Sequence, residues 1–210
     1  MQNLKLNTTL ILGALLSASG AAWAQTSDCA AFAAKALPGM TLKTEAVAGD
    51  STRPPGATAG PMLVAHCKVN GKMAERMGQD GKPYHIGFEL RLPTAWNGRF
   101  LYQGGGGNDG VVRPAVGPQA APGYALNRGF AVVTTDAGHQ GPTADFGFDP
   151  IARTDNAYNA HDQVAVTAKE LIRRFYSKPA DKSYFIGCSG GGRQAMMFTQ
   201  RFPSYFDGVI

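Results

Sequence analysis

A strand-like run and a helix-like run enclose a glycine-rich pentapeptide near the end of the chain. Residues 184–186 are Tyr-Phe-Ile, residues 187–191 read GCSGG, and residues 193–202 have the spacing of an amphipathic helix. The pentapeptide fits G-x-S-x-G, in which a serine occupies a sharp, strained turn between a strand and a helix. Small residues two positions before and after the serine leave room for that turn, and the helix N-terminus favours a developing oxyanion. The pattern predicts Ser189 as a nucleophile.

The preceding hundred or so positions have the alternation of strands and helices that a parallel sheet requires. The segments that we expect to form it are strands at 99–103, 130–135, 184–186 and 207–210 and helices at 161–176 and 193–202. The run at 130–135 is almost entirely apolar or β-branched, which is typical of a strand buried on both faces. Strand–helix–strand order implies βαβ crossovers. We therefore expect an α/β fold with a sheet of the α/β-hydrolase type.

Antiparallel strands are expected in the N-terminal half. A short helix at 30–36 precedes a loop at 49–61 that is rich in Gly, Pro, Ser and Thr. Segments 62–69 and 85–92 alternate apolar and polar residues, as half-buried strands do. Between them, Asn70-Gly71 is a turn signal.

Residues 1–24 have the features of a secretory signal peptide. Lys5 lies near the start, residues 10–16 are apolar, and residues 22–24 read AWA, a small-x-small cleavage site. A membrane anchor is the alternative, but the apolar run is shorter than the ~20 residues that a span needs. We expect cleavage near Ala24-Gln25 and a secreted or periplasmic protein that does not associate with membranes.

Residues 25–210 are then expected to be the N-terminal part of an α/β-hydrolase catalytic domain. The apolar strand predicted at 207–210 has only begun where the sequence stops. We therefore expect the C-terminal part of the sheet, together with any lid, to lie outside this sequence.

The composition excludes two broad classes of protein. Hydrophobic residues make up 44% of the 210, which is enough for a core and excludes wholesale disorder. The net charge is only +5, charged residues are 17%, and the basic residues are not clustered. Binding to nucleic acid therefore has little support.

A second glycine-rich segment, residues 104–107, follows the strand predicted at 99–103. Hydrolases of the α/β class take one oxyanion donor from a loop upstream of the nucleophile. Glycine lets a backbone N–H approach the substrate without a Cβ in the way. We expect the N–H of Gly105 or Gly106 to form the oxyanion hole with that of Gly190, the alternative being a flexible surface loop.

The sequence after Ser189 holds no histidine, and its one acidic residue is Asp207. A serine nucleophile needs a base and an acid, so either these lie outside the sequence or the triad has another order. The segment Ala65-His66-Cys67 resembles the histidine signature of trypsin-like proteases. Two features oppose that order: Cys29 is too far from Cys67 for their small disulfide loop, and a helix rather than a strand is expected after Ser189.

The GCSGG segment resembles the tannase and feruloyl esterase family, whose hallmark is Cys-Ser-x-Gly-Gly and which includes esterases of mono(hydroxyethyl) terephthalate. The resemblance extends to residues 96–100, 135–139 and 193–208. It implies that Ser189 is the nucleophile of a carboxylesterase that acts on small phenolic or aromatic acid esters. It also implies that the acid and base lie beyond Ile210, so that this chain alone is inactive. A non-catalytic, truncated product or pseudoenzyme is the alternative.

The same resemblance implies a pairing for the odd number of cysteines. Cys29 would form a disulfide with Cys67, and Cys188 would pair with a cysteine next to the catalytic histidine, outside this chain. A calcium site would lie in the absent lid, so no metal or cofactor is expected here. Asp207 would be structural.

Several other polar residues precede the pentapeptide and receive structural interpretations. Asp136 and His139 follow a buried strand, where a hydrogen bond that orders a loop is the preferred interpretation. Asn156, Tyr158 and His161 are assigned to helix capping and packing.

Overall fold

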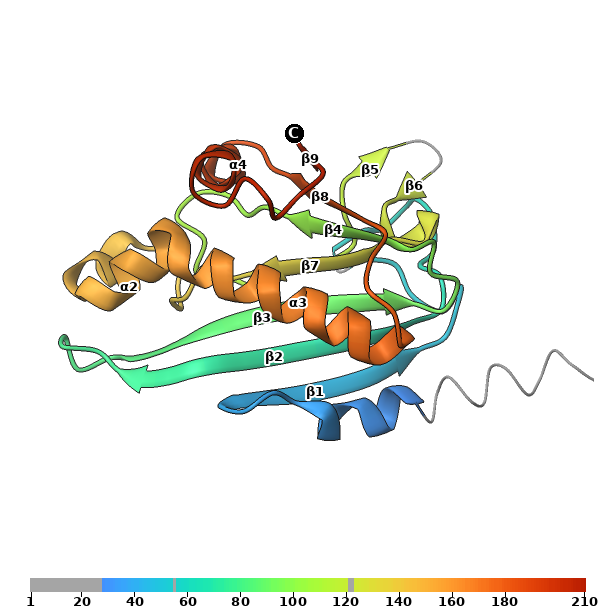
Figure 1. Ribbon diagram of the computed structural model, residues 1–210, viewed down its shortest axis with the longest axis horizontal. Coiled ribbons are helices and arrows are strands. Elements are labelled where there is room, and N and C mark those ends of the chain that lie inside the picture. The colour runs from blue at the N-terminus through green and yellow to red at the C-terminus, as the bar shows by residue number, and fades with distance from the viewer. Residues whose placement is uncertain (1–27, 55, 121–122) are drawn as a thin grey trace, which may run out of the picture.

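A computed structural model describes residues 28–54, 56–120 and 123–210. The expected signal peptide, residues 1–24, lies outside the described residues. The main feature is a seven-stranded sheet with the order β1-β2-β3-β7-β4-β8-β9 (Figure 1). Its strands are β1 (Met40–Val47), β2 (His66–Met77), β3 (Pro83–Pro93), β4 (Arg99–Gln103), β7 (Ala131–Thr135), β8 (Lys182–Ile186) and β9 (Gly208–Val209).

The sheet divides into two halves that meet at β7. Strands β1, β2, β3 and β7 pair antiparallel in that order. Strand β7 then pairs parallel with β4, β4 with β8, and β8 with β9. The expected α/β fold, antiparallel before position 93 and parallel after it, is confirmed. A separate two-stranded ribbon pairs β5 (Gln119–Ala120) with β6 (Gly123–Tyr124).

Two long helices follow the strands, as expected, with shorter helical segments around them. Helix α3 (Ala160–Tyr176) crosses one face of the sheet in front of β3 and β7, and α4 (Gly190–Arg201) follows β8 (Figure 1). The shorter segments are η1 (Ala33–Lys35), η2 (Leu126–Arg128), η3 (Ala144–Phe148), α2 (Pro150–Thr154) and the π-helical η4 (Asp155–Asn159). No helix in the described ranges combines the length and apolar character needed to cross a membrane.

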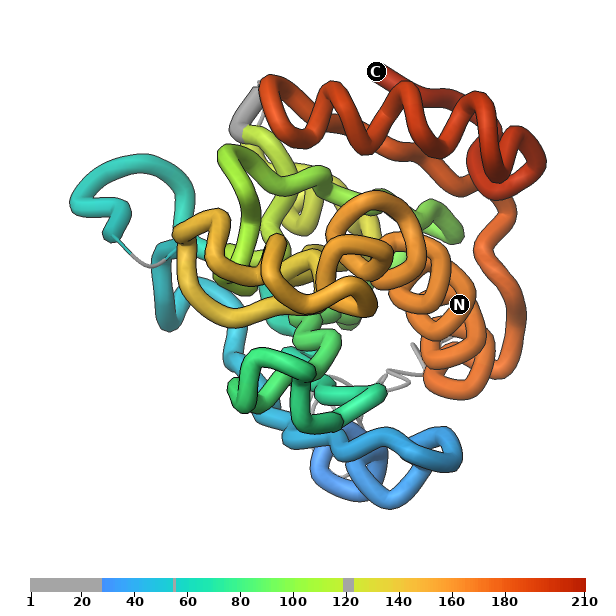
Figure 2. The backbone as a smooth tube through the Cα atoms, turned by 90° about the vertical axis from the view of Figure 1, so that its left-hand side faces the viewer, coloured from blue at the N-terminus to red at the C-terminus, as the bar shows by residue number. Residues whose placement is uncertain are grey.

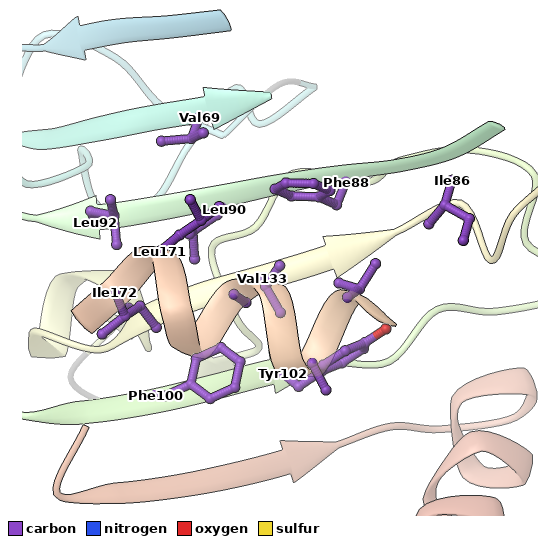
Figure 3. Packing of buried hydrophobic residues seen from close by; sticks show 14 of the residues in the cluster. Val69, Ile86, Phe88, Leu90, Leu92, Phe100, Tyr102, Val133, Leu171 and Ile172 are labelled. Carbon is purple, nitrogen blue, oxygen red and sulfur yellow. The ribbon is translucent and has the colours of Figure 1, made fainter. Parts of the chain in front are cut away.

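The main core lies between the sheet and α3. Leu171 and Ile172 of the helix face the side chains of β3 and β4, among them Leu90 and Phe100 (Figure 3). Alternate residues of β4 and β7 point to the opposite face, where a smaller cluster includes Leu101. Both central strands are therefore buried on both faces, which explains why the sequence at 131–135 is a continuous apolar and β-branched run.

A disulfide joins Cys29 to Cys67, with Cα atoms 5.5 Å apart. Cys29 lies in the helical residues 28–32, and Cys67 lies near the start of β2. The bond therefore ties the first described segment to the antiparallel half. Figure 2 shows this segment and the C-terminal end, with α4, at opposite ends of the molecule.

The prediction of a turn at Asn70-Gly71 is wrong. Strand β2 runs straight through both residues, and Gly71 pairs with Leu42 on one side and Phe88 on the other. A Cβ on Gly71 would lie 2.1 Å from Cζ of Phe88, so glycine makes room for the ring. The chain reverses instead between β2 and β3, where Gly78 N–H donates to Lys82 O.

Three other strands also differ from what the sequence led us to expect. The segment at 85–92 is buried on both faces rather than half-buried, because β3 lies inside the sheet and is covered on each side. The strand expected at 62–69 begins only at His66. The partly exposed strand β1 was not predicted, although its apolar residues alternate at Met40, Leu42 and Ala46.

Candidate active site

Ser189 lies on the turn between β8 and α4. Its backbone has φ 56° and ψ −116°, and it is the N-cap residue of α4. This region of backbone space is sparsely populated for a side chain other than glycine and costs on the order of 1–3 kcal/mol. The serine is therefore held in a strained position at the positive end of a helix dipole.

Three glycines around Ser189 are required by close backbone contacts. A Cβ on Gly187 would lie 2.5 Å from the carbonyl carbon of Gly191. A Cβ on Gly190 would lie 2.8 Å from Gly107 O, and one on Gly191 would lie 2.9 Å from Gly105 O. Backbone meets backbone at each point, so no side chain can move aside to make room.

The loop at 104–107 lies against the N-terminus of α4. Gly191 N–H donates to Gly105 O over 3.1 Å, and Gly104 N–H donates to Ile186 O over 2.8 Å. Arg193 Nη2 donates to Gly107 O over 2.9 Å. The two glycine-rich segments are therefore brought together, although they are separated by some eighty positions in the chain.

Only one of the two glycines expected to supply an oxyanion donor has a free N–H. Gly105 N–H donates to Oε1 of Gln194 over 3.0 Å. Gly106 N–H has no acceptor in the described ranges. Gly190 is the first residue of α4, where a backbone N–H has no partner within the helix. The free donors are thus those of Gly106 and Gly190.

The four histidines are used elsewhere, and no hydrogen bond within the described ranges joins one to Ser189. His66 Nδ1 lies 2.7 Å from Val64 O. His139 Nε2 lies 2.7 Å from Asn108 O. His161 is buried, with Nδ1 3.1 Å from Tyr102 Oη.

Burial decides the charge of these rings. It lowers the pKa of His66 and of His161 to about 4, and it also lowers the pKa of His85 and His139. All four rings are thus biased towards the neutral form.

The trypsin-like order of the catalytic residues is excluded by the α/β sheet and by the helix after Ser189.

Asp136 orders a loop at the end of β7. Its carboxylate accepts from Gly87 N–H at 3.0 Å and from Gly138 N–H at 2.9 Å. Burial raises its pKa to about 6, although these hydrogen bonds oppose the shift. His139 stacks on Phe146 with ring centroids 3.9 Å apart. Both residues have the structural role that we expected.

Asp207 lies at the end of β8 away from the serine turn, and Cys188 directly precedes Ser189. Asp207 accepts from Lys182 Nζ over 2.7 Å and from the backbone N–H of Ser183 over 2.8 Å, so it joins β8 to the start of β9. Cys188 is exposed and, within the described ranges, is not disulfide-bonded. A cavity of about 430 Å³ adjoins Cys188 and is also lined by Gly104, Gly105 and Ile210.

Sequence reasoning missed the pair Gln194 and Asp109. Gln194 Nε2 donates to Asp109 Oδ2 over 2.6 Å, and both side chains are buried. The two residues are 85 positions apart. Gln194 falls in the segment 193–208 singled out above, but nothing in the sequence indicates that it pairs with Asp109.

No group of three or more His, Cys, Asp or Glu side chains in residues 28–54, 56–120 and 123–210 is arranged to hold a metal ion. The calcium site that we expected in a lid stays a prediction.

Comparison with known proteins finds relatives that are named as esterases and hydrolases. The family model described as tannase and feruloyl esterase matches residues 67–210. The chain is 47% identical over 169 residues to a mono(2-hydroxyethyl) terephthalate hydrolase of Piscinibacter sakaiensis, which covers 74% of this chain and 28% of that protein. It is 39% identical over 127 residues to feruloyl esterase B of Aspergillus niger, covering 60% of this chain and 23% of that protein.

Solved structures agree with these relatives. The crystal structure of feruloyl esterase B from Aspergillus oryzae matches with a TM-score of 0.74 at 31% identity. The match covers 88% of this chain and 36% of that one. The chain thus spans about a third of the length of the relatives that it matches.

Proposed function

Because the chain belongs to the tannase and feruloyl esterase family, we propose that it carries the nucleophile and the oxyanion hole of a serine carboxylesterase. The observation that carries the proposal is the strained position of Ser189 at the N-terminus of α4. The free N–H groups of Gly106 and Gly190 supplement it, since they come from segments in direct contact. A strained serine beside two unpaired backbone donors is the arrangement that acyl transfer uses.

The proposed reaction has two halves. Ser189 Oγ attacks the ester carbonyl carbon while a base takes its proton, and the N–H groups of Gly106 and Gly190 stabilise the resulting oxyanion. Collapse of this intermediate expels the alcohol, which receives the proton, and leaves an acyl-serine. Water, activated by the same base, then releases the carboxylic acid. Loss of one such donor lowers kcat on the order of 10²–10³-fold in other enzymes.

We infer that the base and the acid come from residues outside this chain. The four histidines contact other groups, and the chain spans about a third of its relatives' length. Residues 25–210 alone are therefore expected to be inactive. Cys188 is expected to pair with a cysteine beside the catalytic histidine.

The proposed substrate is a small ester of an aromatic or phenolic acid. Two relatives are named for hydrolysis of mono(2-hydroxyethyl) terephthalate and for feruloyl esterase activity. Export after cleavage near Ala24-Gln25 stays a prediction, which N-terminal sequencing of the secreted protein would test.

The test compares three proteins on mono(2-hydroxyethyl) terephthalate and methyl ferulate: the product of the complete reading frame, its Ser189→Ala variant and residues 25–210. Ser189→Ala is expected to lower kcat by about 10⁵-fold or more, as removal of other serine nucleophiles does. Ser204→Ala, which changes an exposed serine beyond α4, is the matched control and should leave kcat unchanged.

Retained turnover in Ser189→Ala would contradict the assignment of the nucleophile. Turnover by residues 25–210 would contradict an external base. If the reading frame stops at Ile210 and its product hydrolyses neither ester, the non-catalytic alternative is correct.

A further inference from the structure

The loop that contains Gly106 is held against α4 by a buried side-chain amide that uses both of its ends. Gln194 lies one turn into α4 and is 7% exposed. Its Oε1 accepts from Gly105 N–H over 3.0 Å, and its Nε2 donates to Asp109 Oδ2 over 2.6 Å. One side chain thus contacts both ends of the segment 105–109.

Asp109 closes the segment from the other side. Its backbone N–H donates to Gly106 O over 3.1 Å, and its φ of 59° turns the chain back towards the loop. A Cβ on Gly105 would lie 2.6 Å from Asp109 Oδ2, so the peptide of Gly105 lies directly on the carboxylate. Asp109 is 8% exposed.

These contacts determine which N–H of the loop is available. The peptide that carries the Gly106 N–H is held through its carbonyl, since Gly105 O accepts from Gly191 N–H. The peptides on either side of it are held by Gln194, through Gly105 N–H, and by the N–H of Asp109, through Gly106 O. Because Gln194 and Gly190 belong to the same helix, the donor from the loop and the donor from the helix share one rigid support.

We propose that Gln194, together with Asp109, is a positioning residue that aligns the Gly106 N–H with the oxyanion formed on the acyl group of Ser189. This inference rests on the proposed esterase function, and neither residue touches the substrate in it. The alignment matters only when negative charge develops on the carbonyl oxygen, so its loss should lower kcat and leave KM unchanged.

The variant Gln194→Met retains the volume and removes both hydrogen bonds. In the complete protein, kcat on the better of the two esters is expected to fall about 10- to 100-fold, with KM within threefold of wild type, because small displacements of catalytic groups have effects of this size. Asn97→Ala is the matched control. Asn97 also uses both ends of its amide, on Arg128 O and Arg99 N–H, but at the opposite end of β4.

Asp109→Asn is the conservative variant, since its amide oxygen can still accept from Gln194 Nε2. We expect kcat within threefold of wild type for Asp109→Asn and a loss like that of Gln194→Met for Asp109→Ala. Urea unfolding of each variant identifies any that fail to fold, and those that fold are compared.

Hydrogen exchange gives a readout that does not depend on turnover. With glycines labelled with ¹⁵N, the amide of Gly105 should exchange about tenfold faster in Gln194→Met than in wild type, whereas Asn97→Ala should leave it unchanged. Unchanged exchange at Gly105, or a kcat for Gln194→Met equal to that of Asn97→Ala, would overturn the proposal. If the wild type hydrolyses no ester while Gly105 exchange still responds to Gln194→Met, the esterase function fails and the support of the loop by Gln194 stands.

Discussion

The antiparallel strands β1–β3 and the parallel strands β4, β8 and β9 meet at β7, and the two halves use glycine in opposite ways. In the antiparallel half, Gly71 makes room for a side chain, the ring of Phe88. At the edge of the parallel half, Gly187, Gly190 and Gly191 make room for backbone. Glycine serves core packing in the first case and the assembly of main-chain hydrogen-bond donors in the second.

The two halves also differ in the polar groups that they use. Charged side chains pair with each other on the antiparallel strands: half-buried Arg76 Nη2 lies 2.7 Å from Oδ1 of Asp149, the N-cap of α2, and buried Arg91 Nε lies 2.7 Å from Glu89 Oε1. At the serine turn, the groups proposed to act on the substrate are one hydroxyl and two backbone N–H groups. Substitutions in the antiparallel half should therefore change stability, and those at the turn should change turnover.

Among substitutions that leave Ser189 in place, the largest effect is expected for Gly187→Ala. Its Cβ would lie 2.5 Å from backbone atoms of Gly191, so the turn must open and Ser189 must move. We expect kcat of the complete protein to fall by at least about 10³-fold. Gly192→Ala is the control, because its Cβ meets nothing within 4 Å, and it should raise stability by up to about 1 kcal/mol. Equal activities of the two variants would contradict the role given to the turn.

Replacing both Cys29 and Cys67 by Ser should separate stability from turnover. The bond closes a segment of 38 residues, for which chain entropy gives about 4 kcal/mol of stabilisation. Urea unfolding should show a loss of about this size, with kcat at 25 °C within twofold of wild type. A folded variant with strongly reduced kcat would show that the antiparallel half influences the serine turn.

Asp136, at the end of β7 where the halves meet, predicts a dependence of stability on pH. Burial raises its pKa from 3.8 to about 6. The folded state then keeps a proton that the unfolded state has lost, so its contribution to stability falls as pH rises from about 4 to about 6. A shift of this size corresponds to roughly 2–3 kcal/mol. The histidines with lowered pKa change stability in the opposite direction over this range, but equally in wild type and in Asp136→Asn. Urea unfolding at pH 4, 5, 6 and 7 should therefore show a stability difference between wild type and Asp136→Asn that falls as pH rises, and parallel curves would contradict it.

The smallest effect is expected for Gly71→Ala in β2. The added methyl group meets the ring of Phe88, and overpacking of this kind costs about 1–3 kcal/mol. Phe88→Leu in the same chain should recover part of the loss, so the two changes should be non-additive in a double-mutant cycle. Additive free energies of unfolding would show that the ring does not explain the glycine. Turnover should not change in Gly71→Ala, in Phe88→Leu or in the double variant.

Elements buried on both faces or on one long face could be predicted well from the sequence. The expected strand at 130–135 and helix at 161–176 correspond to β7 (Ala131–Thr135) and α3 (Ala160–Tyr176). Burial on both faces gives the strand a continuous apolar run, and burial of one face gives the helix apolar residues at helical spacing. The serine turn could be predicted equally well, because a strand, a short glycine-rich segment and a helix follow one another directly in the chain.

Features decided by distant contacts could not be predicted. Asn70-Gly71 has the residues of a hairpin turn, but the ring of Phe88 on the neighbouring strand explains its place inside β2. Likewise, the sequence could not distinguish Gly105 from Gly106 as a donor. The acceptor that occupies Gly105 N–H belongs to Gln194, 89 positions away.

The positive φ of Ser189 has a consequence for how the gene can change. Glycine would adopt this backbone without strain, so Ser189→Gly should give a more stable chain that lacks the nucleophile. A selection for heat resistance alone would then favour loss of the hydroxyl, and only a selection for growth on the ester would retain it. A library sorted by melting temperature should therefore accumulate glycine at position 189, whereas a library sorted by turnover should retain serine. This difference would identify Ser189 as the nucleophile without any structure.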